Sequence, residues 1–188
     1  MSVERPVAEV LAAIATAMRR NGLRWYLFGA QAAIIWGRPR FSVDVDITAV
    51  IGRSDLDAFL AAMETQGFLL LTRKFLADRR VLPFVHSKSN VPLDVVVAGP
   101  GLEEQFLDRA IGVDISGTVI PVISPEDLIV TKIIAGRPKD IEDVRGVLQE
   151  RLDSLDLERV RSLLHLIEQA LSQSDLVSTL ERQIERLR

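Results

Sequence analysis

Two aspartates spaced two residues apart are the part of this sequence best suited to chemistry. Asp44 and Asp46 lie in an apolar run, residues 41–51, whose Val and Ile content is typical of a β-strand. Side chains alternate along a strand, so both carboxylates would point to one face, about 6.5 Å apart. Two like charges so placed repel each other unless a cation lies between them. The pair therefore predicts a divalent metal ion and phosphate chemistry, with a solvated acidic strand face as the alternative.

A third acid, Asp94, lies in the second Val-rich run, residues 92–97. A carboxylate is uncommon in such a strand and is costly to bury unless it is paired or bound to metal. If this strand lies beside that of Asp44 and Asp46, three carboxylates gather around one point. They would suffice for one or two Mg²⁺ ions and leave positions for phosphate oxygens. Taken alone, Asp94 is equally consistent with an acid on an edge strand.

Two further segments could contact a phosphate. Gly29 lies between an expected strand and an expected helix, where glycine lets the backbone approach a ligand and the helix presents free N–H groups. Such glycines are more often purely structural. Lys132 lies in an apolar helix, where a lysine needs a polar partner, and Arg137 follows in a charged turn. Ion pairs within a capped helix turn and a role in phosphate binding are both consistent with this cluster.

The order of apolar periodicities indicates an α/β (α+β) fold, a mixed sheet with helices packed on it and a C-terminal helical tail. We predict one domain over residues 1–152 and a helical extension over 153–188. Ser124 and Pro125 mark a helix start with particular clarity. The expected strands are 24–28, 41–51, 68–72, 79–86, 91–98 and 117–123, and the expected helices are 7–20, 30–36, 54–66, 102–110, 124–135, 138–152, 157–171 and 176–187.

Composition excludes several classes of protein. The 188 residues carry a net charge of −3 and a pI near 5.5, which argues against a protein that coats nucleic acid. There is no cysteine and there are two histidines, so a thiolate site or a histidine-rich zinc site is excluded. No apolar run approaches the roughly 20 residues of a membrane span. The first residues are not signal-like, and we expect a cytoplasmic protein.

Taken together, these residues resemble the nucleotidyltransferase superfamily with the polymerase-beta-like fold. Its signature is a Gly followed by Gly or Ser, then Asp-x-Asp, then a carboxylate on a later strand. Here it maps onto Gly29-Ala30, Asp44-Val45-Asp46 and Asp94. The segments 37–46 and 132–143 resemble the small bacterial branch, which includes toxins of abortive-infection toxin–antitoxin systems and aminoglycoside or lincosamide nucleotidyltransferases. The resemblance covers residues 24 to 150.

The resemblance implies a transfer of a nucleoside monophosphate from a nucleoside triphosphate to an acceptor hydroxyl, with two Mg²⁺ ions as cofactors. Asp44 and Asp46 would hold the metal, and Asp94 would complete the second metal site and could act as base. Ala30 stands where the family has Gly or Ser, which weakens the expectation of tight triphosphate binding. The residues expected to bind the nucleotide are Gly29, Ala30, Arg40, Ser42, Lys132 and Arg137.

The acceptor is left open by the sequence: RNA, a protein side chain and a small molecule all suit three carboxylates. An antitoxin or a second copy of the chain is an expected partner if the toxin resemblance holds. The alternative is a non-catalytic protein of this fold that acts by binding a partner through its amphipathic tail. The tail leucines favour packing on the core over such a surface; they are Leu163, Leu164, Leu171, Leu176, Leu180 and Leu187.

Overall fold

The computed structural model describes residues 5–72, 80–172 and 174–187. Contacts divide the chain into two compact units: a sheet unit, residues 1–31 and 41–123, and a helical unit, residues 32–40 and 124–188. The predicted division between residues 152 and 153 falls inside the helical unit. It remains a prediction, which truncation after residue 152 would test.

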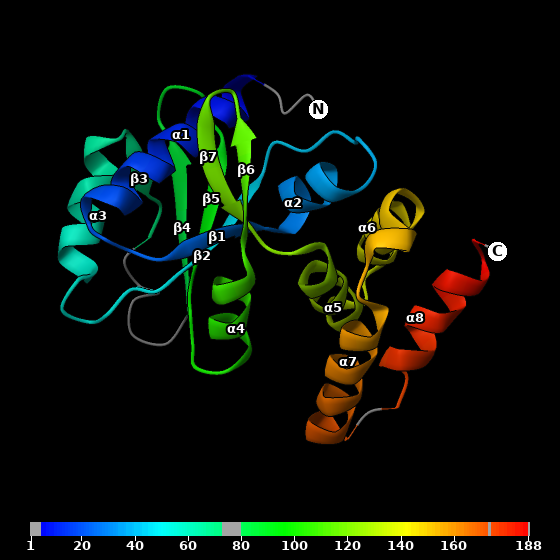
Figure 1. Cartoon of the computed structure of the whole chain (residues 1–188). Coiled ribbons are helices and arrows are strands. Elements are labelled where there is room, and N and C mark those ends of the chain that lie inside the picture. The colour runs from blue at the N-terminus through cyan, green and yellow to red at the C-terminus, as the bar shows by residue number, and fades with distance from the viewer. Residues whose placement is uncertain (1–4, 73–79, 173, 188) are drawn as a thin grey trace. The chain divides into compact units, whose positions relative to one another are not determined.

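The sheet unit contains a mixed sheet of seven strands in the order β3-β4-β5-β2-β1-β7-β6 (Figure 1). The pairs β2–β5 and β1–β7 are parallel, and the other pairs are antiparallel. This mixed sheet with helices packed on it confirms the expected fold class. The strands are β1 (Trp25–Phe28), β2 (Val45–Ala49), β3 (Phe68–Leu70), β4 (Val81–His86), β5 (Pro92–Val97), β6 (Ile111–Ile115) and β7 (Thr118–Val122).

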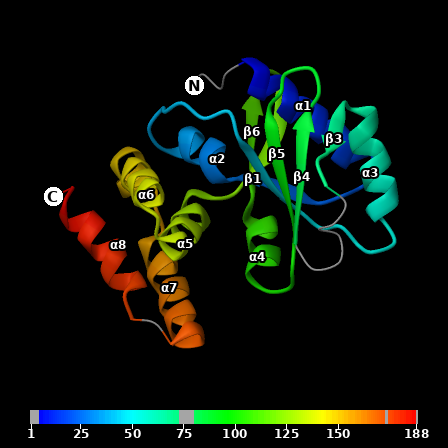
Figure 2. The same cartoon turned by 180° about the vertical axis from the view of Figure 1, so that it is seen from behind.

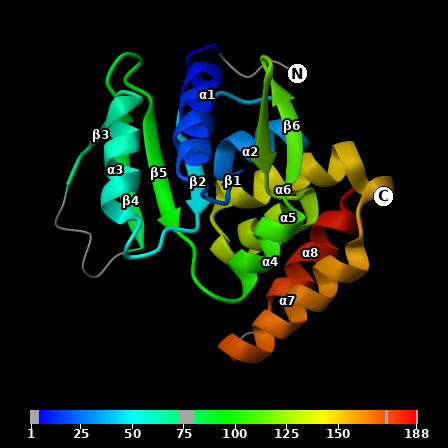
Figure 3. The same ribbon diagram turned by 60° about the vertical axis from the view of Figure 1, so that its left-hand side comes forward.

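The core of this unit lies between the sheet and two helices. Helices α1 (Arg5–Arg20) and α3 (Leu56–Thr65) lie together on one face of the sheet (Figure 3), and α4 (Leu102–Arg109) follows β5. Ile47, Leu93 and Val95 are 0% exposed and point into this core. Because side chains alternate along a strand, the intervening positions of β2 and β5 belong to the opposite face. Those positions include both strand aspartates.

Two elements differ from the sequence prediction. Strand β2 covers Val45–Ala49, shorter than the expected 41–51, so Asp44 lies just before it. Strand β6 was not expected; it forms a hairpin with β7 through Ser116 and Gly117, whose φ angles of 53° and 86° suit a type I′ turn. The strand expected over 79–86 is β4, and residue 79 lies outside the described residues.

The helical unit is built from α5 (Pro125–Ala135), α6 (Pro138–Arg151), a short 3₁₀ turn η1 (Leu152–Ser154), α7 (Leu157–Leu171) and α8 (Leu176–Glu185). Figure 2 shows α7 and α8 side by side. The hydroxyl of Ser124 accepts from the Asp127 N–H at 3.1 Å, and Gly136 ends α5 with φ 64°, as the sequence predicts.

The tail helices pack within the helical unit. Leu164 and Leu180 are 0% exposed, whereas Leu171 is 54% exposed. The carboxylate of Glu168 on α7 accepts the Leu176 N–H at 2.7 Å and so caps the start of α8. Among the described helices, none is long and apolar enough to span a bilayer.

Candidate active site

Asp46 and Asp94 lie opposite each other on neighbouring parallel strands. Residues 46 of β2 and 94 of β5 are partners in the register, between the buried pairs Val45–Leu93 and Ile47–Val95. Partners in a parallel pair point to the same face of the sheet. The structure therefore brings these two carboxylates to one face of the sheet, opposite α1 and α3. From the sequence, this was expected only if the two strands were neighbours.

The Gly29 turn lies directly against Asp46. Gly29 begins α2 (Gly29–Trp36) with φ +65°, a left-handed conformation that favours glycine. A Cβ atom at this position would lie 2.1 Å from Asp46 Oδ2, well inside van der Waals contact. The close approach explains why a glycine stands at this turn. It also places a helix N-terminus, which favours negative charge, beside one of the acids.

Asp44 lies in a segment without regular secondary structure, just before β2, and Gln31 binds its backbone. The Gln31 amide Nε2 donates to the carbonyl oxygens of Ser42 at 2.8 Å and of Asp44 at 3.2 Å. Gln31 was not among the predicted site residues. The available signal was a polar residue inside the apolar helix 30–36, where it is 2% exposed.

The charge of Asp44 acts on Asp94. The Asp94 side chain is exposed, yet partial desolvation by the surrounding chain raises its pKa above the ordinary value, and the neighbouring Asp44 carboxylate raises it further. The carboxylates of Asp44 and Asp94 are therefore close enough to repel each other. A cation in their vicinity would remove that repulsion and lower the pKa of Asp94 again.

The acids fit a magnesium ion that completes its shell with substrate. In the part of the chain that the structure describes, no three or more His, Cys, Asp and Glu side chains are grouped closely enough to hold an ion by themselves. Mg²⁺ is usually bound by one or two carboxylates together with waters and substrate phosphates. Asp46 and Asp94 in register, with Asp44 in electrostatic reach of Asp94, supply that hard-oxygen donor set.

The predicted cations of the helical unit form one buried ionic network. Lys132 Nζ lies 3.0 Å from Asp140 Oδ1 and 2.8 Å from Asp143 Oδ2. Lys132 and Asp143 are each 7% exposed, and Asp140 is 0% exposed. Charges this deeply buried need partners. The ion pairs with Asp140 and Asp143 are therefore a structural reason for a lysine in an apolar helix. A role of Lys132 in phosphate binding stays a prediction.

Arg40 and Arg137 close this network from its edge. Arg40 binds Asp143 through two nitrogens, at 2.8 and 3.1 Å, and Arg137 Nε lies 2.5 Å from Asp140 Oδ2. Burial alone would raise the pKa of Asp140, but the hydrogen bonds and charges of Arg137 and Lys132 outweigh it and lower that pKa. The Arg40 side chain is 38% exposed, so it can still meet a ligand.

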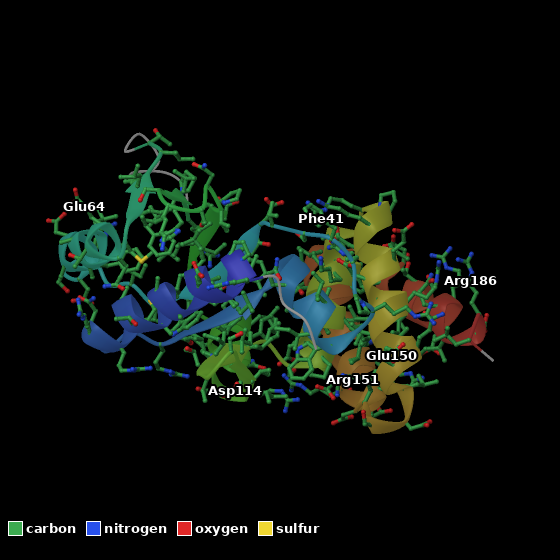
Figure 4. The ribbon with its side chains drawn as sticks, turned by 90° about the horizontal axis from the view of Figure 1, so that it is seen from above. Phe41, Glu64, Asp114, Glu150, Arg151 and Arg186 are labelled. Atoms are coloured by element: carbon green, nitrogen blue, oxygen red, sulfur yellow. The ribbon has the colours of Figure 1, made fainter. Side chains whose placement is uncertain are left out.

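Arg151 binds the C-terminal end of α2. Arg151, at the C-terminal end of α6, donates from Nε to the carbonyl oxygen of Trp36 at 2.9 Å, and its guanidinium lies 4.8 Å from the centre of the Trp36 ring. Figure 4 labels Arg151 beside Glu150. The remaining predicted residues, Ala30 and Ser42, lie in the first turn of α2 and in the segment before β2.

Solved structures share this fold. The antibiotic-resistance factor ANT(2'')-Ia matches with a TM-score of 0.62 and 16% identity, over 88% of this chain and 92% of that chain. The lincosamide antibiotic adenylyltransferase LnuA, with lincomycin bound, matches with a TM-score of 0.55 and 13% identity, over 78% of this chain and 98% of that chain. An antigenic nucleotidyltransferase-like protein from Paracoccidioides brasiliensis matches with a TM-score of 0.59 and 14% identity, over 95% of this chain and 94% of that chain. At these identities the likeness establishes a nucleotidyltransferase fold.

The family is shown by the sequence itself. Residues 8–187 match the family described as nucleotidyltransferase of unknown function (DUF6036), and the chain belongs to that family. No curated protein matches the chain. The predicted superfamily is thereby confirmed.

Proposed function

We propose that this protein is a magnesium-dependent nucleotidyltransferase that moves a nucleoside monophosphate from a nucleoside triphosphate to an acceptor hydroxyl. The observation that carries the proposal is that Asp46 and Asp94 are register partners on one face of the sheet. Asp46 also lies two residues after Asp44 and directly against Gly29. Family membership supports the same chemistry. The acceptor oxygen bonds to the α-phosphorus, the bond from that phosphorus to its bridging oxygen breaks, and pyrophosphate leaves.

Each acid has a role in this proposal. Asp44, Asp46 and Asp94 would hold Mg²⁺, which supplies charge neutralisation at the phosphates when bound. Asp94 is also the group proposed to accept the proton of the acceptor hydroxyl, because its carboxylate lies on the same sheet face as that of Asp46. The backbone of Gly29 and Ala30 would lie against phosphate oxygens, with Ser42, Arg40, Lys132 and Arg137 as further proposed contacts.

The test is label transfer from nucleotides carrying ³²P at the α-phosphate. ATP, CTP, GTP and UTP are incubated with Mg²⁺ and the protein against bulk tRNA, protein, aminoglycosides and lincosamides. Removing a metal ligand from a phosphoryl-transfer site is expected to cost at least about 10³-fold in rate, so Asp46→Asn should abolish transfer. Asp57→Asn is the matched control, the same substitution at an exposed position of α3 in the same unit.

Two outcomes would overturn the proposal: full transfer by Asp46→Asn, or transfer that persists in excess chelator. Failure of all four nucleotides to bind would instead favour the non-catalytic, partner-binding alternative. The small-molecule pools are included because ANT(2'')-Ia has been solved with adenylyl-2''-tobramycin and LnuA with lincomycin. A toxin role, with an antitoxin as partner, is tested by growth on induction of the wild-type chain and of Asp46→Asn.

A further inference from the structure

Asp44 lies one residue before the first paired residue of β2. The register of β2 with β5 begins at Val45–Leu93, and that of β1 with β2 ends at Phe28–Asp46. Ladder hydrogen bonds fix the backbone of a strand, and residues 40–44 have no regular secondary structure. A metal ligand is useful only when its backbone is held within about half an ångström. A carboxylate at residue 44 therefore needs another support.

Gln31 provides that support from the first turns of α2. Its amide nitrogen reaches the carbonyl oxygens of both Ser42 and Asp44, at 2.8 and 3.2 Å. A side-chain amide carries two N–H donors, so one Gln31 side chain can bond both carbonyls. Gln31 is 2% exposed, so the donor side of these bonds is buried even though Asp44 itself is exposed. All three residues belong to the sheet unit.

We infer that Gln31 is a positioning residue for the metal site: it pins the backbone of Asp44 so that this carboxylate stays with Asp46 and Asp94. The inference rests on the proposed function, because it concerns the ligands proposed there. Gln31 acts through Asp44 and touches neither substrate nor metal. Gln31→Met would keep a similar side-chain volume and remove both hydrogen bonds.

The experiment measures binding of Mn²⁺ in the absence of nucleotide, by the electron paramagnetic resonance signal of the free ion. Outer-shell partners of metal ligands are typically worth about 10- to 100-fold in metal affinity, and we expect Gln31→Met to weaken Mn²⁺ binding by that factor. Gln31→Asn, which keeps the amide but shortens the side chain, is a milder second variant expected to fall between. Circular dichroism establishes that each variant is folded.

Gln183→Met is the matched control. Gln183 is 4% exposed, lies on α8 and accepts from Arg145 at 3.0 Å, so its loss also removes a buried amide, but in the helical unit. We expect it to lower stability and leave Mn²⁺ affinity unchanged. In transfer assays, saturating Mg²⁺ should restore the kcat of Gln31→Met, because excess metal offsets a weakened site, whereas general structural damage would lower kcat at every Mg²⁺ concentration.

The outcomes separate this inference from the proposed function. If Asp46→Asn abolishes Mn²⁺ binding but folded Gln31→Met and Gln31→Asn bind as the wild type does, the role of Gln31 is refuted and the metal site stands. If the wild-type protein binds no Mn²⁺ even after a non-hydrolysable nucleoside triphosphate analogue is added, or Asp46→Asn binds it equally well, the metal site itself is refuted. Equal weakening by Gln31→Met and Gln183→Met would also overturn the inference, since both would then act through stability.

Discussion

Gly29→Ala should damage the protein in two separable ways. The backbone at Gly29 has φ +65°, which a residue with a Cβ adopts only at a cost. The new methyl group would also lie 2.1 Å from Asp46 Oδ2 and 2.8 Å from Asp46 Cγ, so the carboxylate must move. The first effect is local to the turn. The second displaces a proposed metal ligand.

The magnitudes follow from these two terms. A left-handed residue with a Cβ costs about 1–2 kcal/mol, and forcing this half-buried contact apart costs about 1–3 kcal/mol, so Gly29→Ala should lower the free energy of unfolding by about 2–5 kcal/mol. Gly22 has nearly the same backbone, φ +60°, but no atom lies within 4 Å of the position of its Cβ. Gly22→Ala should therefore cost only the first term.

The assay is urea denaturation followed by circular dichroism, with label transfer measured on the same preparations. The difference between Gly29→Ala and Gly22→Ala isolates the contact with Asp46. A double variant, Gly29→Ala with Asp46→Ala, removes the two atoms nearest to the new methyl group. It should recover about 1 kcal/mol or more relative to the sum of the single variants, because residues in contact are not additive.

The result that would refute this reasoning is equal destabilisation by Gly29→Ala and Gly22→Ala, with an additive double variant. The cost at residue 29 would then be a property of the backbone alone. Loss of transfer in Gly29→Ala but not in Gly22→Ala is the expected functional counterpart. Normal transfer by a folded Gly29→Ala would show that Asp46 can move without harm.

Three further predictions concern the helical unit. Lys132→Met should lower the free energy of unfolding by about 1–3 kcal/mol, because Asp140 and Asp143 lose the buried cation that they share but keep Arg137 and Arg40 as partners, while Lys139→Met at an exposed position should change little in the same urea titration. The pKa of Asp140 is lowered, so its ion pairs stabilise the fold above its ordinary pKa and are lost as the pH falls through the lowered value. Asp140→Asn should therefore flatten the fall of the unfolding free energy below about pH 4. Ser124→Ala should cost about 1 kcal/mol through the lost cap of α5, measured by thermal unfolding.

Local signals in the sequence are sufficient to predict β5, which carries Asp94, and the start of α5. Strand β5 is predicted over 91–98 and covers Pro92–Val97, because a Val-rich run of this length is typical of a strand. The start of α5 was clear because Ser124 and Pro125 occupy the cap and first-turn positions that these residues favour. Both signals lie within a few residues of the structure they specify.

The features that could not be predicted depend on residues far apart in the chain. The register of Asp46 with Asp94 is set by the order of strands in the sheet, which the periodicity of either strand does not contain. The bonds from Gln31 reach 11 and 13 residues along the chain. The end of β2 at Val45, which places Asp44 outside the ladder, depends on where its partner strands begin and end.

The first turns of α2 serve both members of the Asp-x-Asp pair by different means. Gly29 lies against the side chain of Asp46, and Gln31 binds the backbone of Asp44. Because α2 is a helix, residues 29 and 31 keep a fixed spacing, so the two aspartates are held relative to each other through one rigid element. A strand alone could not do this, since its ladder stops before residue 44. In the proposed site, the helix after the glycine turn would therefore support the carboxylates as well as present backbone N–H groups to the nucleotide.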